Sequence, residues 1–274
     1  MKGSRVNGII RQTAPLRLVQ ITDCHLGAVP GSRLLNIDTD DSLAAVTELV
    51  RQQQPHIDAL LMTGDLTDSG AAAAYRRVLA ATAGLAPVER WLPGNHDSAT
   101  TMRSVLGADA RLQCTLEFDD WLIVTLDSAV PGEIGGRLND VALAALRTSL
   151  QLAPRRHALI CVHHPVVPVG CAWVDPQTIS NAAEFWAEVG NFPQVRAVLS
   201  GHVHQAFDAQ RNGVRVLTTP STCVQFTPSS AEFQVDNIAP GYRWLDLHAD
   251  GHIETGVERV TGREFHVDLS ASGY

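Results

Sequence analysis

Five short polar clusters in the sequence carry side chains of the types that bind metal ions. They are residues 22–25 (TDCH), 64–68 (GDLTD), 94–97 (GNHD), 163–165 (HHP) and 201–204 (GHVH). Each cluster alone has an ordinary explanation, because Asn and Asp favour turns and helix N-caps. A single histidine at the end of a strand is likewise usually a packing residue. All five clusters occur in one order, each after an apolar stretch, and this joint pattern favours a common site.

The donor atoms in these clusters indicate which ions they would bind. His202 and His204 are two residues apart, so on an extended segment both imidazoles share a face and can approach one metal. The clusters offer carboxylates, imidazoles and an amide but no thiolate pair, a set that suits Fe, Mn, Zn or Co. The candidate metal ligands are Asp23, His25, Asp65, Asn95, His163, His202 and His204.

Seven ligands are too many for one ion, but two ions that share one bridging carboxylate would use them all. Two carboxylates against two divalent ions leave a formal charge of about +2, or +3 if one ion is trivalent, at a centre that clamps phosphoryl groups. The chain as a whole has a net charge of −8. A locally positive site in an acidic protein predicts an anionic substrate.

The elements that must position these clusters follow an α/β pattern. Short β-branched stretches alternate with segments of helical period. Strands are expected at 16–22, 57–64, 88–94, 121–127, 157–163 and 195–201, and helices at 41–54, 71–83, 140–151 and 184–189. The polar clusters then lie at the carboxyl ends of strands, where α/β sheets bind ligands.

The last third of the chain changes character at about residue 205. Strand follows strand over 205–262, which predicts a more antiparallel sheet, and 227–241 is the best candidate for an irregular loop or hairpin near a site or a subunit contact. No linker rich in Pro, Ser or Gly separates this part from the rest. We therefore expect a single domain over residues 1–274.

Composition argues against several classes of protein. The 274 residues are 45% hydrophobic and 18% charged, without a Lys/Arg cluster of the kind that contacts nucleic acid. The first 18 residues contain no apolar run typical of a signal peptide, and no stretch of about 18 apolar residues predicts a membrane span. We expect a cytoplasmic protein without a nucleic-acid or membrane partner. The cysteines form no CxxC pair and are expected to be reduced and mostly buried: Cys24, Cys114, Cys161, Cys171 and Cys223.

The ordered clusters resemble the blocks of the calcineurin-like metallophosphoesterase family, which are D-x-H, G-D, G-N-H-D/E, H and G-H-x-H. The resemblance extends over residues 17–204. It implies a four-layer αββα sandwich, in which two mixed β-sheets are flanked by helices.

The resemblance also implies a role for each ligand. One metal would be held by Asp23, His25, Asp65 and His204, and the other by Asp65, Asn95, His163 and His202, with Asp65 as the bridge. His163 is chosen over His164 because the family places its ligand two residues before the proline, which leaves His164 as a supporting or core residue.

The same resemblance assigns the catalytic histidine. His96 would contact the phosphate and protonate the leaving alkoxide, and Asp97 would orient His96. Asn95, His96 and His204 are the expected substrate-binding residues.

Three further stretches narrow the resemblance. HHPVVPVGCAW, TPSTCVQFTP and PGYRWLDL are similar to the bacterial class III 3′,5′-cyclic-AMP phosphodiesterase branch. Val166 and Cys24 depart from the pattern of that branch, but neither replaces a ligand. The branch implies hydrolysis of cyclic AMP to 5′-AMP through a metal-bridging hydroxide, with Fe and Mn as the first choice of metals, Zn or Co as others, and a homodimer as one assembly to test.

Alternative functions stay open at this point. One is a broader phosphodiesterase that acts on 2′,3′-cyclic nucleotides or glycerophosphodiesters, and another is a catalytically inactive metal-binding scaffold. Arg33, Asn36 and Asp38 follow the first ligand pair and are candidates for substrate contact. Capping of the next helix by Thr39, Asp40 or Asp41 explains the acidic part of that stretch equally well.

Overall fold

The computed structural model describes residues 14–273 of the chain. The expectation that the first 18 residues form no signal peptide concerns a stretch whose first 13 residues lie outside the described ones. Within residues 14–273, the helices are all too short or too polar to span a bilayer.

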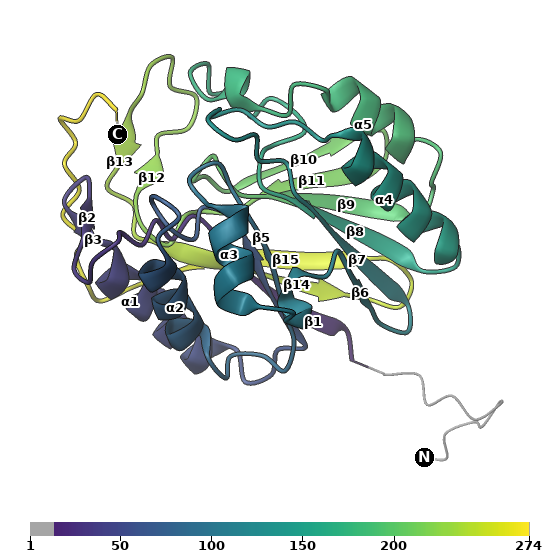
Figure 1. Ribbon diagram of the computed structural model, residues 1–274, viewed down its shortest axis with the longest axis horizontal. Helices are drawn as coiled ribbons and strands as arrows, with labels where there is room; N and C mark the ends of the chain where they lie inside the picture. The colour runs from purple at the N-terminus through teal and green to yellow at the C-terminus, as the bar shows by residue number, and fades with distance from the viewer. Residues whose placement is uncertain (1–13, 274) are drawn as a thin grey trace.

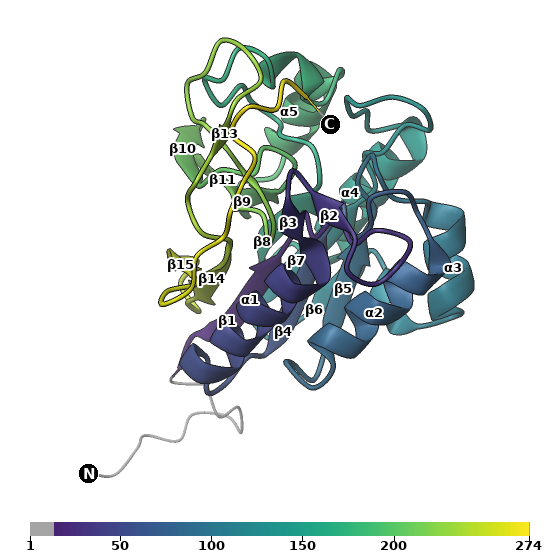
Figure 2. The same ribbon diagram turned by 90° about the vertical axis from the view of Figure 1, so that its left-hand side faces the viewer.

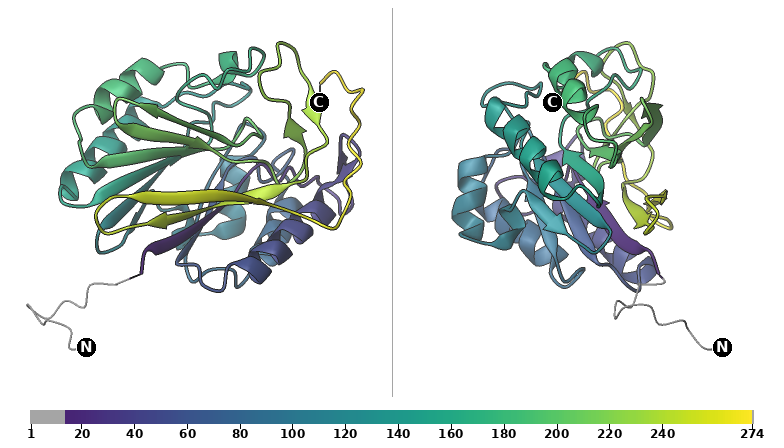
Figure 3. Two further views of the ribbon diagram at one scale, coloured as in Figure 1. Left: turned by 180° about the vertical axis from the view of Figure 1, so that it is seen from behind. Right: turned by 90° about the vertical axis from the view of Figure 1, so that its right-hand side faces the viewer.

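The first of two large sheets has five strands in the order β15-β14-β1-β4-β5. Its core is parallel, because β1 (Leu16–Ile21), β4 (Ala59–Thr63) and β5 (Glu89–Leu92) run in one direction. The C-terminal strands β14 (Gly241–Leu247) and β15 (Ile253–Arg259) add on as antiparallel neighbours. Figure 3 shows these two strands in front when the molecule is seen from behind.

The second sheet has six strands in the order β10-β11-β9-β8-β7-β6. The three strands β7 (Trp121–Leu126), β8 (His157–Val162) and β9 (Val195–Ser200) are parallel. On one side of them lies β6 (Thr115–Glu117), and on the other lie β11 (Val214–Thr218) and β10 (Phe207–Arg211). Both sheets are therefore mixed, as predicted.

Alternation along each strand explains why two sheets form with helices outside them. In β1, Leu16 and Leu18 pack into the core between the sheets, whereas Val19 and Ile21 pack toward helices. One outer layer holds α1 (Thr39–Gln53), α2 (Ala72–Thr82) and α3 (Ala99–Leu106), and the other holds α4 (Asp140–Leu152) and α5 (Ala182–Val189) (Figure 1). Burial of both faces stabilises this arrangement. The predicted four-layer αββα sandwich is confirmed.

The start of α1 differs from the prediction. The N-cap is Asp38, whose carboxylate accepts a hydrogen bond from the backbone N–H of Asp41 at 3.1 Å, and not Thr39, Asp40 or Asp41 itself. An N-cap lies outside the helix, so its side chain can reach back to the first free N–H groups. Asp38 thus has a structural role at the position where a substrate contact had been considered.

Two small hairpins lie beside the sheets. In the first, β2 (Arg33–Leu34) pairs with β3 (Ile37–Asp38), and the C-terminal segment runs past it (Figure 2), where Asp268 N–H donates to the Leu35 carbonyl at 3.0 Å. In the second, β12 (Gln225–Phe226) pairs with β13 (Val235–Asp236), so the stretch 227–241 does contain a hairpin loop. All five cysteines are free thiols, and only Cys114 is exposed.

Candidate dinuclear metal centre

The seven predicted metal ligands all lie beyond the carboxyl ends of parallel strands. Asp23 and His25 follow β1, Asp65 follows β4, and Asn95 follows β5 in the first sheet. His163 follows β8, and His202 and His204 follow β9 in the second. Because the two sheets pack face to face, strand ends from both supply one site.

The first group of donor atoms surrounds His204. Its Nε2 atom lies 3.3 Å from Nε2 of His25 and 3.4 Å from Oδ1 of Asp23. The ligand atoms of these three buried residues all lie within 4.8 Å of one another. Asp65 borders the group, since its Oδ2 atom is 3.7 Å from Nε2 of His25.

The second group surrounds Asn95. Its Oδ1 atom lies 3.2 Å from Nε2 of His163 and 3.1 Å from Nδ1 of His202. Oδ2 of Asp65 is 3.2 Å from Nε2 of His163, so Asp65 borders this group as well. One carboxylate therefore lies between two sets of ligand atoms, which is the arrangement that a bridging ligand requires.

In His163, His202 and His204, a hydrogen bond on the side of the ring away from the site fixes which nitrogen faces the site. The Nδ1 atom of His163 donates to the Thr63 carbonyl and that of His204 to the Val224 carbonyl, each at 2.9 Å. His202 is turned the other way, because its Nε2 atom donates to Oε1 of Gln177 at 3.1 Å. A neutral imidazole that donates from one nitrogen presents the lone pair of the other, as a metal ligand must.

The backbone at the ligands is held in a conformation that ordinary residues avoid. Positive φ angles occur at Asp23 (54°), His25 (46°), Asp65 (48°), His202 (67°) and His204 (47°). Left-handed backbone at a non-glycine residue costs about 1–3 kcal/mol and persists where the surrounding structure enforces it, often at functional sites. Five of the seven predicted ligands share this strain.

Two glycines let the strand ends approach closely enough to form the site. A Cβ atom at Gly94 would collide with the Asp65 side chain and lie 2.5 Å from its backbone nitrogen. Gly64 has φ of +98° and lies directly against the ring of His163. Any side chain at either position would push the two groups of ligands apart.

Burial governs the charge of the site histidines. It lowers the pKa of His202 and of His25 well below the usual value. The neighbouring His164 and His163 lower the pKa of His202 further. For His163 burial acts against protonation, but the nearby Asp65 outweighs it and raises the pKa to about 9. The pKa of Asp65 is correspondingly held low by His163, against the effect of its own burial. His25 and His202 are therefore already in the neutral form that binds a metal, whereas a metal ion would have to displace the proton of His163.

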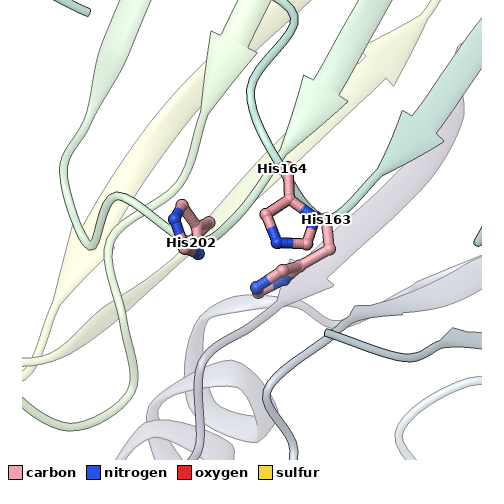
Figure 4. A group of neighbouring side chains, drawn as sticks. All are labelled: His163, His164 and His202. Atoms are coloured by element: carbon pink, nitrogen blue, oxygen red, sulfur yellow. The ribbon is translucent and has the colours of Figure 1, made fainter. Parts of the chain in front are cut away.

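His164 lies beside His163 but is committed to other partners. Its Nδ1 atom is 2.8 Å from the hydroxyl of Ser128, and its Nε2 atom is 3.0 Å from the carbonyl oxygen of Ile134. Burial and the neighbouring His163 lower its pKa to about 3. Figure 4 shows the rings of His163, His164 and His202 together beyond the strand ends. His164 thus supports the loop 128–134, in line with its prediction as a supporting residue.

His96 lies at the rim of the site and is partly exposed. Its ring is 4.7 Å from that of His25, between centroids, in an edge-to-face arrangement. Its Nδ1 atom lies 3.1 Å from the carbonyl oxygen of Asp68, whose carboxylate is 3.7 Å from the same nitrogen. Asp68 therefore contacts this nitrogen, whereas the task of orienting His96 was predicted for Asp97.

Asp97 instead ties together the backbone around the site. Its Oδ1 atom accepts from Thr67 N–H, the Thr67 hydroxyl and the Tyr75 hydroxyl, and its Oδ2 atom accepts from Leu66 N–H and Gly94 N–H, at 2.9–3.1 Å. Burial, with the nearby Asp65, raises its pKa to about 6. In the tight turn 94–97, neighbouring side chains point in different directions, which spacing along the sequence does not reveal.

Two residues near the ligands carry no signal in the sequence. Gln177, in the short 3₁₀ helix Asp175–Gln177, holds His202, and its own amide donates to the Trp173 carbonyl at 3.2 Å, which fixes the orientation of the amide. Phe226 stacks on the ring of His204, with centroids 4.2 Å apart and planes at 3°. Phe226 directly precedes the stretch 227–241, which was predicted to be an irregular loop or hairpin near a site or a subunit contact.

The fold and the paired ligand groups are those of a hydrolase of phosphoric esters, and the chain belongs to the calcineurin-like phosphoesterase family, whose model matches residues 16–206. Members of this family use a dinuclear metal site, and the nitrogen and oxygen donors described above fit one.

The relatives of this chain narrow the class further. It is 43% identical to the 3′,5′-cyclic adenosine monophosphate phosphodiesterase CpdA of Pseudomonas aeruginosa, over 95% of this chain and 96% of that one. Identity to the CpdA enzyme of Escherichia coli is 41%, with the same shares covered. A dimetal phosphatase from Danio rerio has the same fold, with a TM-score of 0.63 and 16% identity over 90% of this chain and all of that one.

Proposed function

We propose that this protein hydrolyses 3′,5′-cyclic AMP to 5′-AMP at a dinuclear centre formed by Asp23, His25, Asp65, Asn95, His163, His202 and His204. One observation carries the proposal: Asp65 lies between two sets of nitrogen and oxygen donors. Its Oδ2 atom is 3.7 Å from Nε2 of His25 and 3.2 Å from Nε2 of His163. The choice of substrate is supported by the names of relatives at 41–43% identity over nearly their whole length.

The ligand set favours an anionic substrate. Asp23 and Asp65 are the only carboxylates in it, and Asn95 contributes a neutral oxygen. With two divalent ions bound, the centre keeps a formal charge of about +2, which attracts a phosphodiester. Iron and manganese are the ions we propose, because borderline first-row ions suit imidazole and carboxylate ligands. Two such ions would supply a nucleophilic water and neutralise charge on the phosphoryl group.

His96 acts on the leaving group. Nδ1 donates to the Asp68 carbonyl, so the proton that moves is the one on Nε2. A water oxygen bonds to phosphorus as that water releases a proton to solvent, the bond from phosphorus to the 3′ oxygen breaks, and His96 delivers its Nε2 proton to the departing 3′ oxygen. The partial exposure of Asn95 and His96, beside buried ligands, lets a substrate reach both.

A substrate comparison tests the proposal. The purified protein is loaded with defined amounts of Mn and Fe, and kcat/KM is measured for cyclic AMP, cyclic GMP, 2′,3′-cyclic AMP and a phosphomonoester. Cyclic AMP is expected to be the fastest. If 2′,3′-cyclic AMP is faster, the enzyme is a broader phosphodiesterase, and if fewer than one metal ion binds per chain, the protein is a scaffold.

A further inference from the structure

A cavity of about 360 Å³ lies between α3, β7 and α4. Its size falls in the range of about 300–1,000 Å³ that small-molecule pockets occupy. Buried apolar side chains, among them Trp91, Met102 and Leu126, line it. Arg103, Asp127 and Asn139, which are exposed, bring polar groups to it. An apolar interior with a few polar groups is the usual composition of a ligand site.

Two of the residues that line this cavity, Pro93 and Asp127, lie close to candidate metal ligands. Pro93 lines it and precedes Asn95 by two residues, a span of at most about 7 Å along the chain. Asp127 lines the cavity from the end of β7, where the pairing of Leu126 with Val162 places it beside His163. Asn95 and His163 are themselves 3.2 Å apart. The cavity therefore borders the candidate metal centre, although none of the seven candidate ligands is among its lining residues.

The polar groups of the cavity can form hydrogen bonds with a heteroaromatic ring that carries a hydrogen-bond donor next to an acceptor. Oδ1 of Asp127 accepts from Ala129 N–H at 3.0 Å, and its Oδ2 atom accepts no hydrogen bond from residues 14–273. Asn139 caps α4 through Oδ1, which leaves its amide N–H groups to donate. Adenine presents an amino group next to a ring nitrogen that accepts, and Arg can stack on such a ring.

We propose that this cavity binds the purine base of the nucleotide, with the 6-amino group donating to Asp127. The proposal rests on the function proposed above and adds the source of base selectivity, since the metal ligands contact only phosphate. Asp127→Asn tests it: the amide carbonyl can still accept from Ala129, while the amide N–H now faces the base as a donor. That donor opposes a 6-amino group but suits the 6-oxo group of cyclic IMP.

The measurement is the ratio of kcat/KM for cyclic AMP to that for cyclic IMP, which does not depend on the fraction of active enzyme. In Asp127→Asn the ratio is expected to fall about 10- to 100-fold, as for loss of a hydrogen bond to a charged group. Ala145→Leu, which fills the cavity from α4, is expected to lower kcat/KM for cyclic AMP about tenfold relative to the base-free bis(p-nitrophenyl) phosphate. Glu133→Gln, exposed on the neighbouring loop and outside the cavity lining, is the matched control and leaves both ratios unchanged.

The base pocket is refuted if Asp127→Asn and Ala145→Leu both keep these ratios within twofold of the wild-type values. If the wild-type protein cleaves bis(p-nitrophenyl) phosphate but not cyclic AMP, the proposed substrate is wrong, and calorimetry with adenosine then decides about the pocket. Saturable binding of adenosine that Asp127→Asn weakens at least tenfold supports the base pocket, and absence of adenosine binding refutes it.

Discussion

Asp97→Asn separates the structural role of this carboxylate from a catalytic one. Asp97 accepts five hydrogen bonds, and its Oδ2 atom alone accepts from Leu66 N–H at 3.1 Å and Gly94 N–H at 3.0 Å. The amide of an asparagine has the same shape but only one oxygen. With that oxygen in the place of Oδ1, the amide N–H₂ faces two backbone donors that have lost their acceptor.

The size of the effect follows from these contacts. Each buried donor left without a partner costs about 1–3 kcal/mol, so two of them destabilise the fold by about 2–6 kcal/mol. Gly94 is one of the two, and it directly precedes Asn95 and His96. We therefore expect metal affinity and turnover to fall together with stability.

The assay is urea unfolding of the metal-free protein at pH 8, above the pKa of about 6 that burial gives to Asp97. Asp68→Asn is the matched control: its side chain is 45% exposed, so its unfolding free energy is expected to change by less than about 0.5 kcal/mol, while turnover falls through His96. If Asp97→Asn unfolds like the wild-type protein and only turnover is lost, the structural role is wrong and Asp97 acts on catalysis.

Three further outcomes are expected. Gln177→Leu removes the acceptor of His202 Nε2 and should weaken binding of the second metal about 10- to 100-fold by calorimetry, whereas Gln177→Glu should restore it. His96→Ala should keep both metals by elemental analysis but hydrolyse cyclic AMP about 10²- to 10⁴-fold more slowly, with a smaller loss for p-nitrophenyl esters, which need no acid. Lowering the pH from 7 to 5 should destabilise the metal-free protein in urea, because histidines of the unfolded chain bind protons near pH 6.5 that buried His164, His25 and His202, with lowered pKa values, do not. His164 alone contributes about 2 kcal/mol, and the three together outweigh the opposite effect of Asp97 and His163, whose pKa values are raised to about 6 and about 9. Stability that is unchanged or rises between pH 7 and 5 would contradict this account of the buried histidines.

Much of the fold could be predicted because its signals are local. Leu16 and Leu18 alternate with Val19 and Ile21 within one strand, and that alternation already requires a layer on each face. The helix α3 was not predicted, because it is only eight residues long and its apolar stripe of Met102, Val105 and Leu106 is short, with Met102 alone buried. Its N-cap, Ser98, which accepts from Thr101 N–H at 3.2 Å, is the one local signal of its start.

Part of the candidate site could likewise be predicted from the sequence, and part of it could not. The seven candidate ligands could be grouped from strand ends, since parallel strands carry them to one edge of the sandwich, but the choice of His163 over His164 needed the family pattern. The groups that orient the imidazole rings could not be predicted. Gln177 contacts His202 from a separate loop, and the group that contacts His204 is the backbone carbonyl of Val224, which has no signal in the sequence. The hydrogen bonds of Asp97 to Leu66, Thr67 and Gly94 could not be predicted either, because adjacency in sequence does not show in which direction a side chain points within a tight turn.

The left-handed backbone at the ligands has a consequence for the amount of protein in a cell. Five such residues together cost the folded chain at least about 5 kcal/mol, a large part of the stability of an ordinary domain. Ions that bind only the folded form offset this through mass action. We therefore expect that a shortage of metal leaves more chains unfolded at any moment and open to proteases, and that the cellular level of the enzyme follows the availability of its metals.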